Sequence, residues 1–187
     1  MTIRDIIATM NLELDISFRV ATEDDLPLLE WYGQYAHFRN LFRMTYDGQV
    51  RGERLMILAD LKDFPIGQIF LLLNQRINMW QMMTTRHGKS PEQRGYLYAL
   101  RVMDHLQGMG IGTRLILEAE NILINNGCTW ATISVAKENE GALRLYKRLG
   151  YDAYMEDEGR WSYIDHHGKT VKVHEPCWMM EKRLIQS

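Results

Sequence analysis

Hydrophobic and polar residues alternate along this chain with two periods, and the shorter period predicts β-strands. Alternation with a period of two, or a short apolar run between turn residues, is typical of a strand. The segments that follow this rule are 16–20, 54–59, 67–73, 96–103, 129–136, 151–155, 160–164 and 178–184. We predict tight turns at 63–65 and 165–168, where polar residues, Gly or Pro interrupt the apolar pattern.

Apolar residues with a helical period separate several of these strands. Thr22 precedes a run of acidic residues, which is typical of a helix start, and we predict a helix from there to about Phe42 with a break near Gly33. Two more helices are predicted at 110–125 and 139–149, each ended by a glycine. The order of elements predicts a mixed α/β domain that covers 1–187.

Two segments fit this order less well. Residues 1–15 carry apolar side chains at helical spacing, and we predict a short amphipathic N-terminal helix. Residues 74–95 mix apolar and basic residues without a clear period, and we predict a long loop or an extended hairpin. That insertion is interpreted as a mobile surface loop, a lid or a dimer contact. The apolar residues available for a dimer contact are Met79, Trp80, Met82 and Met83.

Charge and composition exclude several classes of protein. The chain has 187 residues, with 22 basic and 24 acidic side chains and a formal net charge of −2. This near-balance argues against a general nucleic-acid binder and against a polybasic membrane-surface protein. No uncharged stretch approaches the roughly 20 residues that span a bilayer, and no targeting segment is visible, so we expect a cytoplasmic protein. Cys128 and Cys177 lie in apolar stretches and are expected to be buried free thiols.

The most informative segment is a glycine-rich turn between a predicted strand and a predicted helix. Gly108, Gly110 and Gly112 lie where free N–H groups of a helix start can bind a phosphate or pyrophosphate. The segment is not a P-loop, because Gly112 is followed by Thr113 and Arg114 rather than by Lys and Ser or Thr. The Rossmann fingerprint also fails, because no glycine stands at its last position. A nucleotide- or NAD-dependent enzyme therefore rests on the turn alone.

Two motifs in this half of the chain resemble those of the GNAT superfamily of acyl-CoA-dependent N-acyltransferases. The first is Gln107-x-x-Gly110-x-Gly112, which resembles the family's Gln/Arg-x-x-Gly-x-Gly/Ala motif. The second runs from Asn139 to Tyr151 and resembles the family's Asn-x-x-Ala-x-x-Leu-Tyr-x-x-Leu-Gly-Phe/Tyr segment. The resemblance covers roughly 96–151 closely, and the order of elements in 16–73 agrees more loosely.

The resemblance implies a fold, a cofactor and a site. It implies a mixed, mostly antiparallel twisted sheet flanked by helices, whose central strands splay apart to hold acetyl-CoA, with no metal. The backbone of Leu100, Arg101 and Val102 is then expected to pair with the pantetheine arm. Asn139 is expected to orient the cofactor, and Tyr146 to lie near its sulfur. The N–H groups expected to hold the pyrophosphate are those of Gln107, Gly108, Met109, Gly110, Ile111, Gly112 and Thr113.

The spacing of Asn139 and Tyr146 agrees with these roles. They are seven residues apart, so they share one helix face and lie about 10.5 Å apart along its axis. Tyr146 is the candidate general acid that protonates the departing thiolate. For an ordinary phenol and an ordinary thiol, that proton transfer is uphill by only about 2 kcal/mol.

The general base is left open by the sequence. Many members of the family carry a Glu on the strand before the glycine turn, but residues 95–99 contain no carboxylate. Tyr96, Tyr98, His174 or a water relay are the alternatives.

We therefore expect an N-acetyltransferase that moves an acetyl group from acetyl-CoA directly to a primary amine of a small molecule or peptide. The alternative is a non-catalytic acyl-CoA-binding or sensor module. Residues 30–47 lie where the family's helices flank the acceptor, 156–158 is a polar turn or a negative field for a cationic amine, and 165–168 is a polar turn rather than a metal corner. The acceptor, the acyl length and the oligomeric state are left open.

Overall fold

The computed structural model describes residues 14–73 and 94–184. The expected N-terminal helix at 1–15 and the expected insertion at 74–95 lie almost entirely outside the described residues. The two exceptions are that 14–15 have no regular structure and that 94–95 already belong to a strand.

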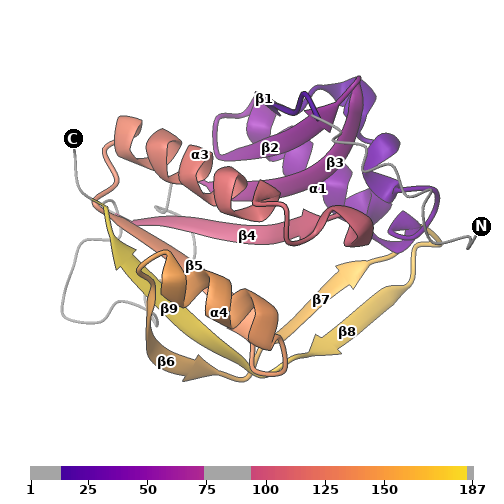
Figure 1. The fold of residues 1–187 in the computed structure, drawn as a ribbon. Helices are drawn as coiled ribbons and strands as arrows, with labels where there is room; N and C mark the ends of the chain where they lie inside the picture. The colour runs from indigo at the N-terminus through magenta and orange to yellow at the C-terminus, as the bar shows by residue number, and fades with distance from the viewer. Residues whose placement is uncertain (1–13, 74–93, 185–187) are drawn as a thin grey trace, which may run out of the picture.

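A seven-stranded sheet with the strand order β1-β2-β3-β4-β5-β9-β6 forms the centre of the fold (Figure 1). Its pairs are antiparallel except for β4 and β5, which run parallel. The strands are β1 Ser17–Val20, β2 Arg54–Leu61, β3 Phe64–Leu72, β4 Arg94–Val102, β5 Trp130–Ala136, β6 Asp152–Asp157 and β9 Cys177–Arg183. The expectation of a mixed, mostly antiparallel sheet flanked by helices is confirmed.

The two faces of this sheet are covered by different helices. Along β2, Ile57 and Ala59 belong to one core, and Met56 and Leu58 belong to the other, as the two-residue period of a strand requires. The first core packs under α3 (Ile111–Asn125) and α4 (Glu140–Arg148), and the second packs under α1 (Arg39–Val50). The β3–β4 and β4–β5 pairs join the N-terminal and C-terminal halves of the chain in one sheet.

The helix predicted at 22–42 is wrong in both its extent and its type. Three short 3-10 helices cover this region, namely η2 Glu23–Asp25, η3 Leu28–Glu30 and η4 Ala36–Phe38. The regular helix α1 begins only at Arg39 and continues to Val50. Trp31, Tyr32 and Gly33 have left-handed backbone, with φ of 42°, 59° and 91°, which ends any helix there. The buried Trp31 indole donates a 2.8 Å hydrogen bond to the Pro65 carbonyl, and this contact holds the turn.

A second, two-stranded sheet was only half predicted. The predicted strand at 160–164 is β7 (Arg160–Ile164), but its partner β8 (Thr170–His174) was not predicted. The two strands form an antiparallel hairpin that extends from the lower edge of the main sheet towards the segment before α1 (Figure 1). The Asn40 side chain donates a 2.6 Å hydrogen bond to the carbonyl of Asp165 at the hairpin turn. This contact ties the hairpin to α1.

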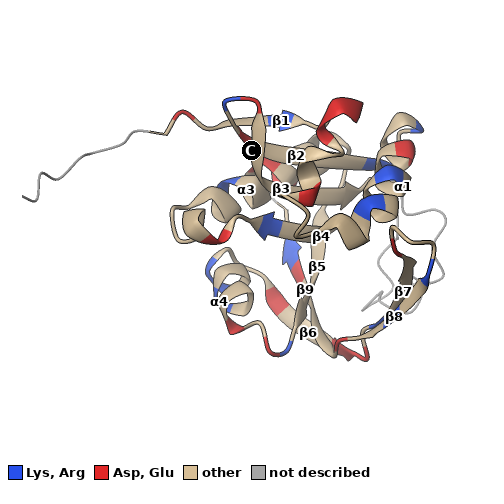
Figure 2. Ribbon diagram, turned by 90° about the vertical axis from the view of Figure 1, so that its right-hand side faces the viewer, with Lys and Arg blue, Asp and Glu red and all other residues tan. Residues whose placement is uncertain are grey.

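Along the ribbon, positions of Lys and Arg (blue) are interspersed with positions of Asp and Glu (red) (Figure 2). Among the described residues, no helix is both long enough and apolar enough to span a membrane. Cys128 and Cys177 are buried and are not joined in a disulfide.

Candidate active site

The parallel strands β4 and β5 pair over only part of their length. Four residues of β4, Arg94–Leu97, pair with Trp130–Ile133 of β5. Beyond this point β4 stays paired with β3, and β5 stays paired with β9, so the two strands diverge (Figure 1). Leu100, Arg101 and Val102 lie in the divergent part of β4. In the part of the chain that the structure describes, no strand occupies their β5-facing edge, which is therefore free to pair with an extended ligand.

A β-bulge marks the place where the divergence begins. The pairing of β3 with β4 shifts register between Gln68 and Phe70, opposite Ala99. Ala99 has a φ of 52°, which is uncommon for a residue other than glycine. The buried Gln68 side chain faces the Ala99 carbonyl, with 3.4 Å between Nε2 and the oxygen. Such bulges redirect the backbone at functional sites.

The glycine turn follows directly on this end of β4. Gly108 and Gly110 have φ of 80° and 86°, which glycine adopts without strain, and a β carbon at either position would meet no atom within 4 Å. The turn is closed by Gln107, whose side-chain amide donates to the Val102 carbonyl at 3.1 Å and to Asp104 Oδ1 at 3.1 Å. Open space therefore lies directly beside a rigid turn.

The N–H groups of the turn and of the first turn of α3 are available to a ligand. The Gln107 N–H already donates to the Asp104 carbonyl at 3.3 Å, and the Arg114 N–H donates to the Gly110 carbonyl at 3.0 Å. Between them, the N–H groups of 108–113 have no acceptor among the described residues. Six free donors at a positive helix end suit a pyrophosphate. Of the predicted segment, Gln107 thus supports the turn, and the other six residues carry N–H groups without an acceptor among the described residues.

Gly112 marks the point where three elements converge. A β carbon built on it would lie 3.7 Å from a methyl of Leu145 on α4 and 3.7 Å from a methyl of Val102 on β4. The turn, the divergent end of β4 and helix α4 therefore border one another.

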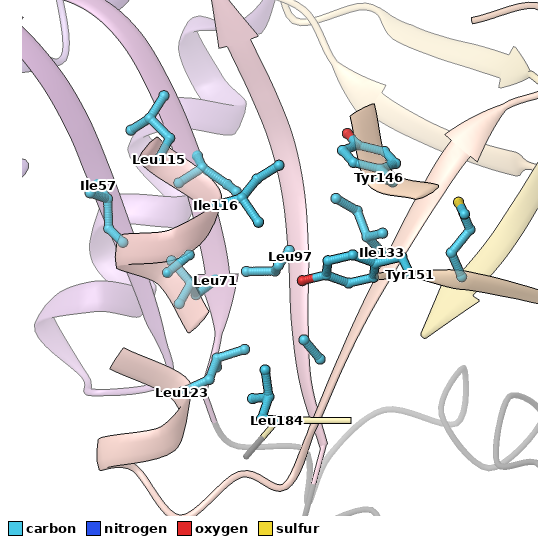
Figure 3. Packing of buried hydrophobic residues seen from close by; sticks show 14 of the residues in the cluster. Ile57, Leu71, Leu97, Leu115, Ile116, Leu123, Ile133, Tyr146, Tyr151 and Leu184 are labelled. Atoms are coloured by element: carbon cyan, nitrogen blue, oxygen red, sulfur yellow. The ribbon is translucent and has the colours of Figure 1, made fainter. Parts of the chain in front are cut away.

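Helix α4 positions the two predicted residues of the second motif. Asn139 caps the helix by accepting a 3.0 Å hydrogen bond from the Ala142 N–H. Tyr146 lies two turns further on and is 5% exposed, with its ring centre 6.2 Å from that of Tyr151. Figure 3 shows Tyr146 and Tyr151 on one side of Leu97, and the α3 side chains on the other.

The hydroxyl of Tyr146 is available as a proton donor. Burial, with a smaller contribution from Tyr96, raises the pKa of Tyr146 above that of an ordinary tyrosine, so the phenol stays protonated at neutral pH. Within the described residues its hydroxyl has no hydrogen-bond partner, yet it is not among the polar atoms that are sealed from solvent.

The candidate bases are placed differently from one another. The Tyr96 hydroxyl lies 2.9 Å from Ser134 Oγ across the β4–β5 pair, and burial raises the pKa of Tyr96 to about 12. The Tyr98 hydroxyl accepts a 2.8 Å hydrogen bond from Arg54. His174 lies on the exposed side of β8, 3.4 Å from Glu158, and is not brought into the site. The contact between Tyr96 and Ser134 was not predicted. Ser134 is a polar residue between the apolar Ile133 and Val135, and this alternation indicated that its side chain lies on the opposite face of the strand from theirs.

Within residues 14–73 and 94–184, no three His, Cys, Asp or Glu side chains lie close enough together to hold a metal ion. At 165–168, the Asp165 carboxylate instead accepts hydrogen bonds of 2.9 Å from the N–H groups of His167 and Lys169. The predicted polar turn is confirmed.

Comparison with known proteins agrees with this architecture. A family model described as the acetyltransferase (GNAT) family matches residues 12–151. Among solved structures, Arabidopsis thaliana NAA60 in complex with acetyl-CoA superposes with a TM-score of 0.65 at 20% identity, over 90% of this chain and 98% of that one. The ribosomal-protein-S18-alanine N-acetyltransferase of Escherichia coli superposes with a TM-score of 0.64 at 15% identity, over 92% and 96% of the two chains. At these identities the likeness shows the fold.

Curated relatives match shorter segments. Thialysine N-epsilon-acetyltransferase of Mus musculus is 37% identical over 77 residues, which are 41% of this chain and 45% of that protein. N-alpha-acetyltransferase MAK3 of Arabidopsis thaliana is 38% identical over 58 residues, 31% of this chain and 30% of that protein. The match thus spans less than half of either relative. Because the family model covers more than half of the chain and the fold agrees with it, the chain belongs to the GNAT family of acetyltransferases.

Proposed function

We propose that this protein transfers an acetyl group from acetyl-CoA to a primary amine by direct attack, with Tyr146 as the general acid. The observation that carries the proposal is the convergence of three features at Gly112: the divergent edge of β4, the free N–H groups of 108–113, and helix α4 with Tyr146. A strand-like edge suits an extended amide chain, and the helix start suits a pyrophosphate. Acetyl-CoA carries these two groups in the same order, with the extended pantetheine chain followed by the pyrophosphate.

The residues present fit acetyl-CoA. The edge of Leu100, Arg101 and Val102 would pair with the pantetheine amides, and the donors of 108–113 would hold the pyrophosphate next to the open space at Gly108 and Gly110. Bound there, acetyl-CoA supplies an activated acetyl thioester. Backbone N–H groups near the Ala99 bulge would polarise its carbonyl, which is an oxyanion-type stabilisation.

The raised pKa of Tyr146 has two consequences for its role. It keeps the proton on the phenol at neutral pH, which a general acid requires. It also makes the phenol a weaker acid, but a thiolate leaving into the same water-poor environment is destabilised by the same desolvation. The cost of the proton transfer therefore depends on the difference between the pKa shifts of the phenol and of the thiol, which have the same sign.

Tyr96 is disfavoured as the general base. With a pKa of about 12, its ionisation at pH 7 costs about 7 kcal/mol. Deprotonation of a lysine-like amine costs about 4.6 kcal/mol, and that of an α-amine about 1 kcal/mol. The amine is therefore more easily activated by loss of its proton to water than by a tyrosinate.

The acceptor belongs to the class of primary amines on small molecules or peptides. The curated relatives are named for the ε-nitrogen of thialysine and for an α-nitrogen, which are both amine nitrogens. Both names support the same bond change, in which an amine nitrogen replaces sulfur on the acetyl carbon.

A Tyr146→Phe variant tests the proposal. Release of free CoA and the mass of the acetylated amine are measured with a panel of amines, alongside the affinity for acetyl-CoA. We expect wild-type turnover, with a loss of roughly 100-fold or more in kcat and retained acetyl-CoA binding in the variant. Binding without turnover in the wild type would favour the acyl-CoA-binding module. Unchanged turnover in the variant would remove Tyr146 as the acid.

A further inference from the structure

The side chain of Arg101 lies on the opposite face of β4 from the glycine turn. Its neighbours Leu100 and Val102 pack against the core under α3, and the alternation of a strand directs Arg101 to the other face. There its guanidinium carbon lies 4.9 Å from the ring centre of Tyr35 and 4.7 Å from that of Phe38. This face is the one that η4 and the start of α1 cover.

The Arg101 guanidinium has aromatic neighbours but no counter-charge within 14–73 and 94–184. Its Nη1 is sealed from solvent without a hydrogen-bond partner, and the structure forms no ion pair to it among the described residues. Glu30, which precedes Tyr35 by five residues, forms an ion pair with Arg39 at 2.6 Å instead. Burial accordingly lowers the pKa of Arg101 from its ordinary value. Two aromatic faces compensate part of this desolvation, and a carboxylate would compensate more.

Two other partly or fully buried arginines in the described chain, Arg19 and Arg94, have carboxylate partners, whereas the half-buried Arg54 donates to the Tyr98 hydroxyl at 2.8 Å. Arg19 contacts Asp25 at 2.7 Å and Asp60 at 2.6 Å, and Arg94 contacts Glu181 at 2.7 Å. Arg101 differs from them in lying at the divergent end of β4, where the proposed transfer takes place. A buried cation without an anion is costly, so its place beside a ligand site suggests that the ligand supplies the anion.

The aromatic surroundings of Arg101 extend to the β7–β8 hairpin. The Phe38 ring centre lies 5.0 Å from that of Tyr163 on β7, and the His37 ring centre lies 6.2 Å from the same tyrosine. The residues around Arg101 thus come from β4, η4 and β7. An apolar, aromatic wall of this kind suits the methylene chain of a ligand whose charged end reaches the guanidinium.

We propose that Arg101 binds a carboxylate of the acceptor, so that the preferred substrates are amines that carry a carboxylate on the same molecule. The inference rests on the proposed function, because it takes Ala99 as the place where the acetyl group is presented. Arg101 lies two residues beyond Ala99, roughly 6 to 7 Å along a strand. Amine and carboxylate are therefore expected to be separated by an aliphatic chain, as in the ε-amine of lysine, rather than by a single carbon.

Lysine and cadaverine test this directly, because they differ by the carboxylate alone. The readout is the ratio of kcat/KM for lysine to that for cadaverine, with the acetylated nitrogen identified by mass spectrometry. We expect the ratio to favour lysine by roughly 10- to 100-fold in the wild type, with acetylation on Nε. Arg101→Met is expected to bring the ratio close to one, mainly through KM. Arg101→Lys is expected to restore part of the preference.

The matched control is Arg51→Met, because Arg51 is exposed and forms its ion pair with Glu53 at 2.9 Å, away from the site. Its ratio should equal that of the wild type.

A peptide pair that differs only in Asp against Asn after the reactive amine distinguishes an acidic peptide from a free amino acid as the source of the carboxylate. A ratio near one for both pairs in the wild type overturns the inference even if Arg101→Met fails to fold. Acetyl-CoA binding without acetylation of any amine overturns the proposed function instead.

Discussion

The side-chain oxygen of Asn139 accepts a 3.0 Å hydrogen bond from the backbone N–H of Ala142, three residues further along the chain. This contact starts α4 and fixes the helical register in which Tyr146 follows two turns later. Because the helix is nine residues long, its formation depends on the cap and on packing more than on intrinsic propensity. The position of the proposed general acid is therefore coupled to Asn139.

Replacing Asn139 separates capping from cofactor contact. Asn139→Ala is expected to lower the free energy of unfolding by about 1 kcal/mol, and Asn139→Ser, which keeps a capping oxygen, by a few tenths of that. Urea denaturation measures both. If Asn139 also orients the cofactor, the serine variant will bind acetyl-CoA more weakly while its stability is nearly unchanged. Equal affinity of Asn139→Ser and wild type would limit Asn139 to its structural role.

Gly112 is expected to tolerate alanine but not a larger side chain. A methyl group at this position meets Leu145 and Val102 at 3.7 Å, which is ordinary van der Waals contact. Gly112→Ala therefore gains the helix propensity of alanine, about 0.5–1 kcal/mol, in thermal or urea unfolding. Gly112→Leu overpacks the point where α3, α4 and β4 meet, and is expected to cost about 1–3 kcal/mol. A stable leucine variant would contradict the convergence described for these elements.

Removal of the Arg19 side chain is expected to lower the free energy of unfolding. Its guanidinium binds Asp25 and Asp60, whose side chains are 5% and 6% exposed. Burial alone would raise the pKa of Asp25, but hydrogen bonds from Arg19 and Thr22 lower it overall. Arg19→Met removes the cationic partner of two buried carboxylates, which keep only hydrogen bonds from Thr22 and Asp63, and is expected to cost about 2–4 kcal/mol at pH 7.

The acid side of the stability profile provides the check on Arg19. A carboxyl whose folded-state pKa is lowered adds stability above its unfolded pKa, near 4, and loses it as the pH falls through the folded value. The difference between wild type and Arg19→Met should therefore shrink below about pH 4. A difference that is constant between pH 7 and pH 3 would show that the loss comes from packing of the Arg19 side chain instead.

Alkaline pH is expected to destabilise the fold through its buried tyrosines. Burial raises the pKa of Tyr96 to about 12 and raises the pKa values of Tyr146 and Tyr151 as well. Above pH 10 the unfolded chain loses these protons but the folded chain keeps them, so stability is complete below about pH 10 and falls as the pH rises. Each tyrosine contributes a slope of up to about 1.4 kcal/mol per pH unit.

Tyr96→Phe is expected to flatten that slope by the contribution of one tyrosine, as urea unfolding between pH 9 and 11.5 would show. Tyr32→Phe is the matched control, because Tyr32 is 90% exposed, and its slope should equal that of the wild type. Absorbance of tyrosinate follows the same titration. An unchanged slope in Tyr96→Phe would show that the Tyr96 hydroxyl is not protected by burial.

The parts of this fold that the sequence predicted are those set by local rules. The helix from Asn139 and the strand at 129–136 depend on a cap, a period and a terminating glycine, all of which are readable in a short window. The region from Thr22 to Phe42 was mispredicted because its turn is held by Trp31 and Pro65, which are 34 residues apart. Contacts of that kind leave no periodic signal.

The site shows the same division. The glycine turn and Tyr146 were predicted as site residues from motifs of fixed spacing, but the place of the Arg101 side chain was not predicted. Its partners Tyr35 and Phe38 are more than 60 residues away in sequence, and the strand that carries Arg101 changes register at the Ala99 bulge. After a bulge, the following side chains lie on the opposite face from the one that simple alternation predicts. The face of the Arg101 side chain therefore could not be predicted from strand alternation in the sequence.

The most direct measurement is a calorimetric titration of the protein with acetyl-CoA, repeated with Gly110→Glu and Gly127→Glu. Both glycines have positive φ, at 86° and 78°, and open space beside them, but they lie at opposite ends of α3. The two variants thus add the same charge at similar positive φ. Saturable one-to-one binding that is lost in Gly110→Glu and retained in Gly127→Glu is the result we predict. Absence of acetyl-CoA binding in the wild type, or equal loss in both variants, would contradict the assignment of the glycine turn as the acetyl-CoA site.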